Sequence, residues 1–213
     1  MRSYRLTTPE ECIYFAPRKG GLPMRQPLFH ITREMISDVF DSELRGRRDI
    51  SVCFTGHRLI PSADMKSLTQ RLDEVLEKLY QLGFRDFFSG AALGFDVLAA
   101  ERVILLKARH PDVHLRLAIP CSSQSDHWTD SDCSRYERML YHADSTHVLS
   151  RQYYEGCMHV RNRFMVDRSA FCLCFLTHVK GGTMATVAYA MQQSCPVLNL
   201  AMEDAAEAFI REG

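Results

Sequence analysis

From residue 50 onward, short apolar segments alternate with longer amphipathic segments. The short segments are apolar on both faces, which is typical of strands in a parallel sheet that is covered on both sides. They span residues 50–55, 84–89, 113–119, 145–149, 170–176 and 196–200. The segments between them have helical periodicity and span residues 64–82, 93–109, 132–143, 157–168, 184–193 and 204–211. This alternation predicts a Rossmann-like, three-layer α/β/α fold with a mainly parallel sheet.

Residues 1–48 have a different character. Four prolines and the Gly20-Gly21 pair interrupt any long regular element. Within this segment, residues 32–44 have helical spacing, with Thr32 as the expected N-cap. We therefore predict two parts: an N-terminal extension over residues 1–48 with a short helix, and a domain over residues 49–213. The extension is expected to pack on the domain or on a protein partner.

Charge and composition exclude several classes of protein. The formal net charge is zero, so no overall field attracts nucleic acid or an anionic membrane. No apolar run approaches the roughly 20 residues of a membrane helix, and no apolar segment typical of a signal peptide follows the first residues. We therefore expect a cytoplasmic protein with neither a membrane nor nucleic acid as partner.

The chain has eight cysteines, an even number that could indicate a disulfide framework. A chain of this size without a secretory signal is more typical of reduced thiols. Cys53, Cys172 and Cys174 lie in strand-like segments and are expected to pack in the core. The histidines and cysteines lack the spacing of a metal site, so no metal and no required cofactor are expected.

Small and polar residues follow the predicted strands. In an open parallel sheet, the carboxyl ends of the strands share one edge, and ligands bind in the crevice there. Glycines in such loops let the backbone approach an anion, and a following helix directs its free N–H groups at it. The expected ligand-binding residues from these loops are Thr55, Gly56, His57, Arg58, Ser89, Gly90, Gly94, Asp96, Pro120, Trp128, Gly181, Gly182 and Thr183.

Several of these residues also have a purely structural interpretation. Residues 181–183 could form an ordinary turn capped by Thr183, and His57 with Arg58 could be a surface pair. Asp96 could compensate a helix dipole or bind ligand hydroxyls. Trp128 could stack on a base or pack as a lid.

Taken in order, these motifs resemble the YpsA-like family of the SLOG superfamily, which also includes the DNA-processing protein DprA and the LOG phosphoribohydrolases. The resemblance covers residues 50–200 and includes, besides the loops above, the segment of residues 161–167. It implies a Rossmann-like fold that binds a nucleotide-derived ligand, such as an ADP-ribose-type compound. It also implies ligand contacts from Arg161 and Asn162, and a tendency to form homo-oligomers.

The resemblance to LOG enzymes is incomplete. Arg161 matches their catalytic arginine, but Ala185 and Thr186 stand where LOG enzymes have two glutamates, and Asn162 stands where they have lysine. Cleavage of a glycosidic bond depends on nearby carboxylates. If the chain is an enzyme, the candidate catalytic residues are therefore Arg161, Asp96 and Asp167, with Glu101 as a further source of a carboxylate.

Three functions follow as hypotheses. The first is a sensing or regulatory module that binds a nucleotide-derived ligand without reacting it. The second is a LOG-like hydrolase that cleaves an N-glycosidic or phosphoester bond of a nucleotide derivative. The third is DprA-like binding of single-stranded DNA, against which the zero net charge argues.

Overall fold

The structure is a computed structural model and describes residues 13–15 and 46–211. The predicted helix over residues 32–44 lies outside the described residues. The division of the chain at residue 48 therefore stays a prediction.

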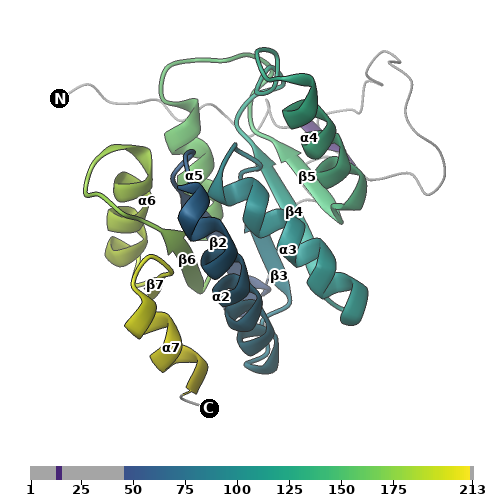
Figure 1. Ribbon diagram of the computed structural model, residues 1–213. Coiled ribbons are helices and arrows are strands. Elements are labelled where there is room, and N and C mark those ends of the chain that lie inside the picture. Colours follow the sequence, from purple (N-terminus) through teal and green to yellow (C-terminus); the bar gives the residue numbers. More distant parts are fainter. Residues whose placement is uncertain (1–12, 16–45, 212–213) are drawn as a thin grey trace.

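The core of the fold is one seven-stranded sheet with the order β1-β5-β4-β3-β2-β6-β7 (Figure 1). Six strands run parallel, and β1 pairs antiparallel with β5. The strands are β1 (Ile13–Phe15), β2 (Ser51–Gly56), β3 (Asp86–Ser89), β4 (His114–Ile119), β5 (Ser145–Val148), β6 (Phe171–Phe175) and β7 (Val197–Asn199). The predicted strands and the mainly parallel sheet are confirmed.

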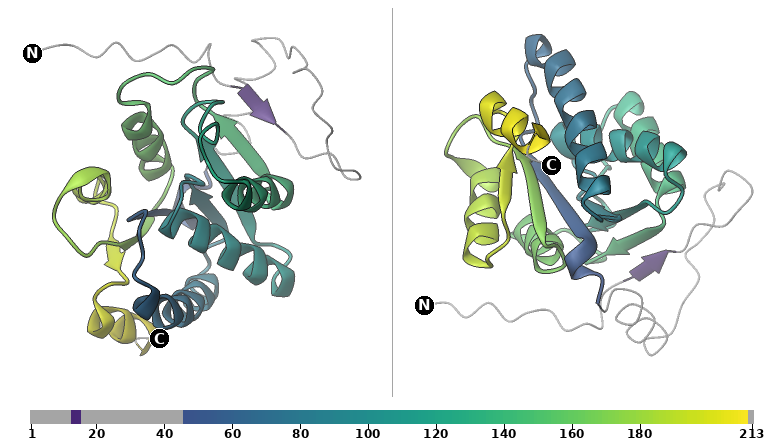
Figure 2. Two further views of the ribbon diagram at one scale, coloured as in Figure 1. Left: turned by 45° about the horizontal axis from the view of Figure 1, so that its top comes forward. Right: turned by 90° about the horizontal axis from the view of Figure 1, so that it is seen from below.

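Helices cover both faces of this sheet. They are α2 (Ser62–Gln81), α3 (Phe95–Arg109), α4 (Asp130–His142), α5 (Cys157–Asp167), α6 (Gly181–Gln192) and α7 (Glu203–Arg211). The helices α2, α3, α4 and α7 bury apolar side chains against one face, in the larger core cluster. The helices α5 and α6 cover the other face (Figure 2), where their buried side chains pack in a smaller cluster. The predicted three-layer α/β/α architecture is confirmed.

The strand order creates a switch point in the middle of the sheet. The chain proceeds from β2 through β3 and β4 to β5 on one side, and then returns to place β6 and β7 on the other side of β2. At such a point the loops after two adjacent strands diverge, and a crevice opens outside their carboxyl ends. The loops after β2 and β6 therefore border the predicted ligand site.

The strand β1 is a feature that the sequence analysis did not predict. Its three residues pair with β5 in the register Ile13↔Val148, Tyr14↔His147 and Phe15↔Thr146. Figure 2 shows this purple strand at the edge of the sheet. A three-residue strand gives too few positions for a periodic signal, and it pairs with a segment about 130 residues away in the sequence.

The helix α6 begins at Gly181, three residues before the predicted start at Met184. Two consecutive glycines indicated a loop, because glycine disfavours the helix interior. In the structure, Lys180 is the N-cap, and Gly181 adopts a φ of +86°, which glycine accommodates without strain. Residues 181–183 are thus the first turn of α6 rather than a loop before it.

The predicted core role of Cys53, Cys172 and Cys174 is confirmed, because each is at most 1% exposed. The seven cysteines of the described residues carry free thiols. No helix in the described ranges is long and apolar enough to cross a membrane.

Candidate functional site

His57 links the two loops at the switch point. Its backbone N–H donates to the carbonyl of Phe175 at 3.3 Å, and its Nε2 accepts from the backbone N–H of Thr177 at 3.0 Å. Its ring stacks on that of His178, with 3.9 Å between centroids and 3° between planes. Burial and the neighbouring His178 lower the pKa of His57. His57 therefore joins the end of β2 to the loop that precedes α6.

Three of the predicted glycines are required by contacts within the protein. A Cβ atom on Gly56 would lie 2.3 Å from the Cβ of Phe95, and one on Gly94 would lie 2.4 Å from the carbonyl oxygens of His57 and Arg58. A Cβ atom on Gly90 would lie 1.5 Å from Nη1 of Arg161. These glycines let the loops after β2 and β3 pack on each other and on α5.

Arg161 and Asp96 form a buried ion pair at the centre of the site. Each residue is 5% exposed, and Nη1 of Arg161 lies 3.7 Å from Oδ2 of Asp96. This separation is too long for a hydrogen bond, and Nη1 has no hydrogen-bond partner among the described residues. The structure thus brings together two of the three predicted catalytic candidates and leaves the buried Nη1 of the arginine without a hydrogen-bond partner among the described residues.

The environment of this pair disfavours charge. Burial raises the pKa of Asp96 to about 6, although Arg161 and the backbone N–H groups of Ala92 and Gly90 act in the opposite direction. Burial also lowers the pKa of Arg161, which Asp96 raises. A buried cation with an incomplete set of partners favours binding of an anion.

The helix α5 connects Arg161 to the first turn of α6. Nε of Arg161 donates to Oδ1 of Asn162 at 2.7 Å, and Nδ2 of Asn162 donates to Oγ1 of Thr186 at 2.7 Å. Oγ1 of Thr186 in turn donates to the carbonyl of Gly182 at 2.8 Å. Asn162 and Thr186, two of the residues that depart from the LOG pattern in the resemblance described above, therefore form a neutral hydrogen bond.

Gly181 and Gly182 differ from the other glycines of the site. Both are exposed, and a Cβ atom on either would meet no described atom within 4 Å. Thr183, which follows them, is 9% exposed. No packing contact in the described structure therefore accounts for these two glycines, unlike Gly56, Gly90 and Gly94.

Other predicted residues support the loops around the pair. Ser89 is buried, and its Oγ donates to the carbonyl of Asp96 and accepts from the N–H of Ala91. Trp128 packs edge-on against Tyr136 of α4, with 5.4 Å between centroids. Thr55 and Pro120 are buried at the ends of β2 and β4, whereas Arg58 is exposed. Their predicted contacts with a ligand stay predictions.

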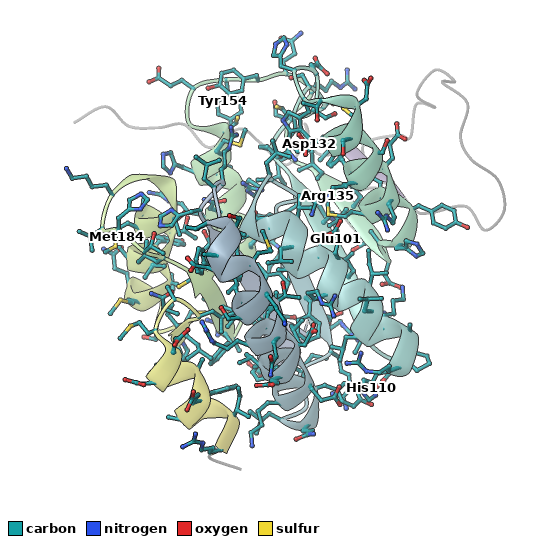
Figure 3. The ribbon with its side chains drawn as sticks, viewed as in Figure 1. Glu101, His110, Asp132, Arg135, Tyr154 and Met184 are labelled. Atoms are coloured by element: carbon teal, nitrogen blue, oxygen red, sulfur yellow. The ribbon has the colours of Figure 1, made fainter. Side chains whose placement is uncertain are left out.

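The remaining candidate carboxylates lie elsewhere. Asp167 accepts a hydrogen bond from the hydroxyl of Tyr189 at 2.7 Å, six residues and about 9 Å along α5 from Arg161. Glu101 forms a two-bond ion pair with Arg135, at 2.9 and 2.8 Å, between α3 and α4 (Figure 3). The structure therefore does not bring Asp167 to Arg161, and it pairs Glu101 with another cation.

Gln124 is a residue of this region that the sequence analysis missed. Its Nε2 donates to the carbonyls of Ala91 at 3.1 Å and Gly90 at 3.4 Å, and its Oε1 is buried without a hydrogen-bond partner in the described structure. It lies in the polar loop after β4, where no motif distinguished it from the neighbouring serines.

A groove of about 220 Å³ lies between α5 and α6. It is lined by His159, Asn162, Arg163, Ala185, Thr186, Ala188, Tyr189 and Gln192. The guanidinium of Arg163 lies over the ring of Tyr189, 5.1 Å from its centroid. This groove adjoins the site through Asn162 and Thr186, and its lining includes neither Arg161 nor Asp96.

No three histidine, cysteine, aspartate or glutamate side chains within residues 13–15 and 46–211 lie close enough to hold a metal ion.

Comparison with known proteins identifies relatives for most of this domain. The family model for YpsA, described as the YspA SLOG family, matches residues 60–202. A UPF0398 protein of Halalkalibacterium halodurans is 28% identical over 118 residues, which cover 54% of this chain and 62% of the relative. The uncharacterized SPbeta prophage-derived protein YoqJ of Bacillus subtilis is 30% identical over 140 residues, or 59% of this chain and 81% of the relative. The chain thus spans from about half to four fifths of the curated relatives it matches.

Two solved structures share the fold. DNA processing protein A from Streptococcus pneumoniae has a TM-score of 0.54 at 18% identity, over 78% of this chain and 58% of that protein. DNA processing protein A from Helicobacter pylori, described for its single-stranded DNA binding mode, has a TM-score of 0.52 at 17% identity, over 79% of this chain and 77% of that protein. At these identities the likeness concerns the fold alone.

Proposed function

The chain belongs to the YspA SLOG family, and from that membership we propose that its domain binds a nucleotide-derived ligand. The ligand class is an ADP-ribose-like compound or a nucleoside phosphate, bound at the carboxyl edge of the sheet. We further propose that the domain acts as a sensing or regulatory module. It would transmit the bound state to a partner, for which residues 1–48 are the candidate contact.

The observation that carries this proposal is the buried Nη1 of Arg161, which has no hydrogen-bond partner among the described residues. A buried polar group without a hydrogen bond costs about 1–3 kcal/mol, and more for a charged group. A phosphate oxygen is a strong acceptor that shortens and strengthens such a bond through its charge. Since Asp96 stands 3.7 Å from Nη1, it neutralises the arginine without occupying this donor.

The first turn of α6 supplies the second part of the proposed site. Gly181 and Gly182 leave open space above their backbone, so an anion can approach their N–H groups. The partial positive charge at a helix N-terminus favours that position for phosphate. The hydrogen bonds from Arg161 through Asn162 and Thr186 to Gly182 hold the two parts together.

The same arrangement favours binding over hydrolysis. Ala185 is exposed and carries no acid, and Thr186 is engaged by Asn162. Asp96 is the one predicted catalytic carboxylate that lies beside Arg161. A LOG-like hydrolase stays the alternative and would show product after prolonged incubation, by mass spectrometry, with nucleoside monophosphates or ADP-ribose.

Binding of single-stranded DNA is the second candidate. The fold is similar to two DNA processing proteins, one of which was described for binding single-stranded DNA. Zero net charge gives this chain little of the general attraction to a phosphate backbone on which such binding depends.

The test is a calorimetric panel of ADP-ribose, nucleoside mono- and diphosphates and a short oligonucleotide. We expect one nucleotide-derived compound to bind the wild type, and Gly182→Asp to abolish binding because it places a carboxylate where the phosphate lies. Absence of binding by every member, or equal binding by Gly182→Asp, contradicts the proposal.

A further inference from the structure

The orientation of the Gln124 side chain is fixed by its neighbours. Both hydrogen bonds that it makes run to carbonyl oxygens, those of Gly90 and Ala91, and a carbonyl can only accept. The amide nitrogen must therefore face these two residues, and Oε1 must point away from them. Oε1 is buried, and no described group donates to it. Gln124 thus presents one unsatisfied acceptor of fixed direction.

The segment that Gln124 holds is the same segment that contacts Arg161. Ala91 has a φ of +49°, an uncommon conformation for a residue with a side chain, and its N–H and carbonyl are both hydrogen bonded. Gly90 lies so close to Arg161 that a Cβ would overlap Nη1. Two residues that each carry an unsatisfied polar atom, Arg161 with its donor Nη1 and Gln124 with its acceptor Oε1, therefore contact one two-residue segment, Gly90 and Ala91.

Few ligand groups complement both atoms at once. A bare phosphate satisfies the guanidinium through its oxygens, but its only donor is a P–OH group on the same anion. A sugar phosphate carries acceptors on its phosphate and donors on its hydroxyls, separated by only a few bonds. Sites with a buried group that hydrogen bonds to a hydroxyl discriminate strongly against compounds that lack it.

We propose that Oε1 of Gln124 accepts a hydrogen bond from a sugar hydroxyl of the ligand whose phosphate binds Arg161. The site thereby selects a ribose phosphate over a bare phosphate or diphosphate. This inference rests on the proposed function, and it adds the recognised part of the ligand and a residue that determines specificity.

The experiment measures a ratio of affinities, so that general damage to the site cancels. The hydroxyl-bearing ligands are ribose 5-phosphate and ADP-ribose, and their bare counterparts are inorganic phosphate and pyrophosphate. Each is titrated by calorimetry into the wild type, Gln124→Met and the control Gln81→Met, which changes an exposed glutamine at the end of α2. Thermal unfolding of each variant reports whether it is folded.

We expect Gln124→Met to reduce the preference of the wild type for the sugar phosphates by about tenfold, the equivalent of one hydrogen bond. Gln81→Met should leave it unchanged. Gln124→Glu keeps an acceptor oxygen. Its negative charge weakens sugar phosphates and bare anions alike, so the ratio should remain near that of the wild type.

Two results overturn the inference while the proposed function stands. One is a wild type that binds both classes without preference, and the other is a Gln124→Met protein with an unchanged ratio, as expected if water alone satisfies Oε1. Two other results would contradict the proposed function as well. One is that no phosphate compound binds the wild type, and the other is that Arg161→Met binds all of these compounds as the wild type does.

Discussion

Arg161 and Asp96 are oppositely charged side chains that lie in the interior without a direct hydrogen bond between them. Breaking a buried ion pair leaves an uncompensated charge, which is strongly destabilising. The loop glycine Gly90 provides the space in which this pair lies, because no other residue fits against Nη1. The pair and the glycine therefore act as one unit.

Gly90→Ala tests this unit. Its Cβ would lie 1.5 Å from Nη1 and 2.6 Å from Oδ2 of Asp96, so the arginine must move. We expect a loss of about 1–3 kcal/mol in the free energy of unfolding, as for other overpacked interiors, together with weaker ligand binding. Urea denaturation checks the first effect and calorimetry the second. A variant as stable as the wild type would show that the guanidinium has room to move.

Gly182→Ala is the counterpart of Gly90→Ala at a glycine with no described atom close to the position of the new Cβ. Its φ lies outside the positive range, no described atom lies within 4 Å of the new Cβ, and alanine is the better helix former. We expect unfolding to shift upward by about 2–4 °C, since a gain of up to about 1 kcal/mol has that effect in a chain of this size. Ligand affinity should fall, because the methyl group occupies the approach to the backbone.

The prediction for Gly182→Ala fails in either of two ways. A lower midpoint of unfolding would show a packing role for Gly182. Higher stability with full ligand affinity would show that the phosphate does not approach this turn.

The raised pKa of Asp96 predicts that the stability of the protein depends on pH. Its pKa is about 6 in the folded state against the ordinary value of 3.8, so the folded state binds more protons between these values. The stability contributed by this carboxyl group is therefore complete below pH 4 and is lost as the pH rises through 6. The difference amounts to about 3 kcal/mol, from about two pKa units.

Urea denaturation of the wild type and Asp96→Asn at pH 4 and pH 7 measures this dependence. The wild type should lose stability relative to Asp96→Asn as the pH rises, because asparagine does not titrate. A constant difference between the two proteins would contradict the raised pKa of Asp96.

At the scale of residues, the sequence identified the loops of the site but not the role of each member. The sequence does not distinguish the five glycines of these loops. Which of them are required by packing depends on groups far away in the sequence, such as Arg161 and Phe95. Gln124 had no motif, because its importance comes from the direction of one amide oxygen. Asn162 and Thr186 were recognised as departures from LOG enzymes, whereas their mutual hydrogen bond required the structure.

Among the elements, β1 has the clearest structural consequence. It covers the edge of β5, a strand whose four residues are all buried. An unpaired edge presents free N–H and C=O groups to which other chains can add. Deletion of residues 1–45 is therefore expected to expose this edge and to promote association in a concentration-dependent manner.

Light scattering coupled to size exclusion checks this expectation over a range of protein concentrations. Full-length Tyr14→Pro is the companion variant, because proline is poorly tolerated in a paired strand and leaves the rest of the segment in place. A truncated protein with the size and thermal stability of the full chain would show that β1 does not protect the edge.

The sequence predicted elements better when they were long or fully apolar. The six domain helices and six parallel strands agree with the predicted segments, because buried parallel strands and amphipathic helices leave strong patterns. The clearest differences occur where the pattern is short or contains glycine, at β1 and at the first turn of α6.

For the whole molecule, the balance of charge bears on the choice between ligands. With a net charge of zero, the chain as a whole does not attract single-stranded DNA, and we expect the site to neutralise few phosphates. We therefore expect any affinity for a labelled oligothymidine to be weak, with a slope of log K against log salt of about −2 or shallower. Fluorescence anisotropy at salt concentrations from about 20 to about 200 mM measures this slope. A steep slope with tight binding would favour the DNA-binding function.

The central claim is that one phosphate-bearing ligand contacts both Arg161 and the first turn of α6. Its most direct test is a titration of isotope-labelled protein with ADP-ribose and nucleoside phosphates, followed by nuclear magnetic resonance. The account predicts that the amides of Gly181 and Gly182 and the guanidinium of Arg161 shift together and saturate with a single dissociation constant. Shifts confined to the groove of Arg163 and Tyr189 between α5 and α6, or no shifts with any of these compounds, would contradict it.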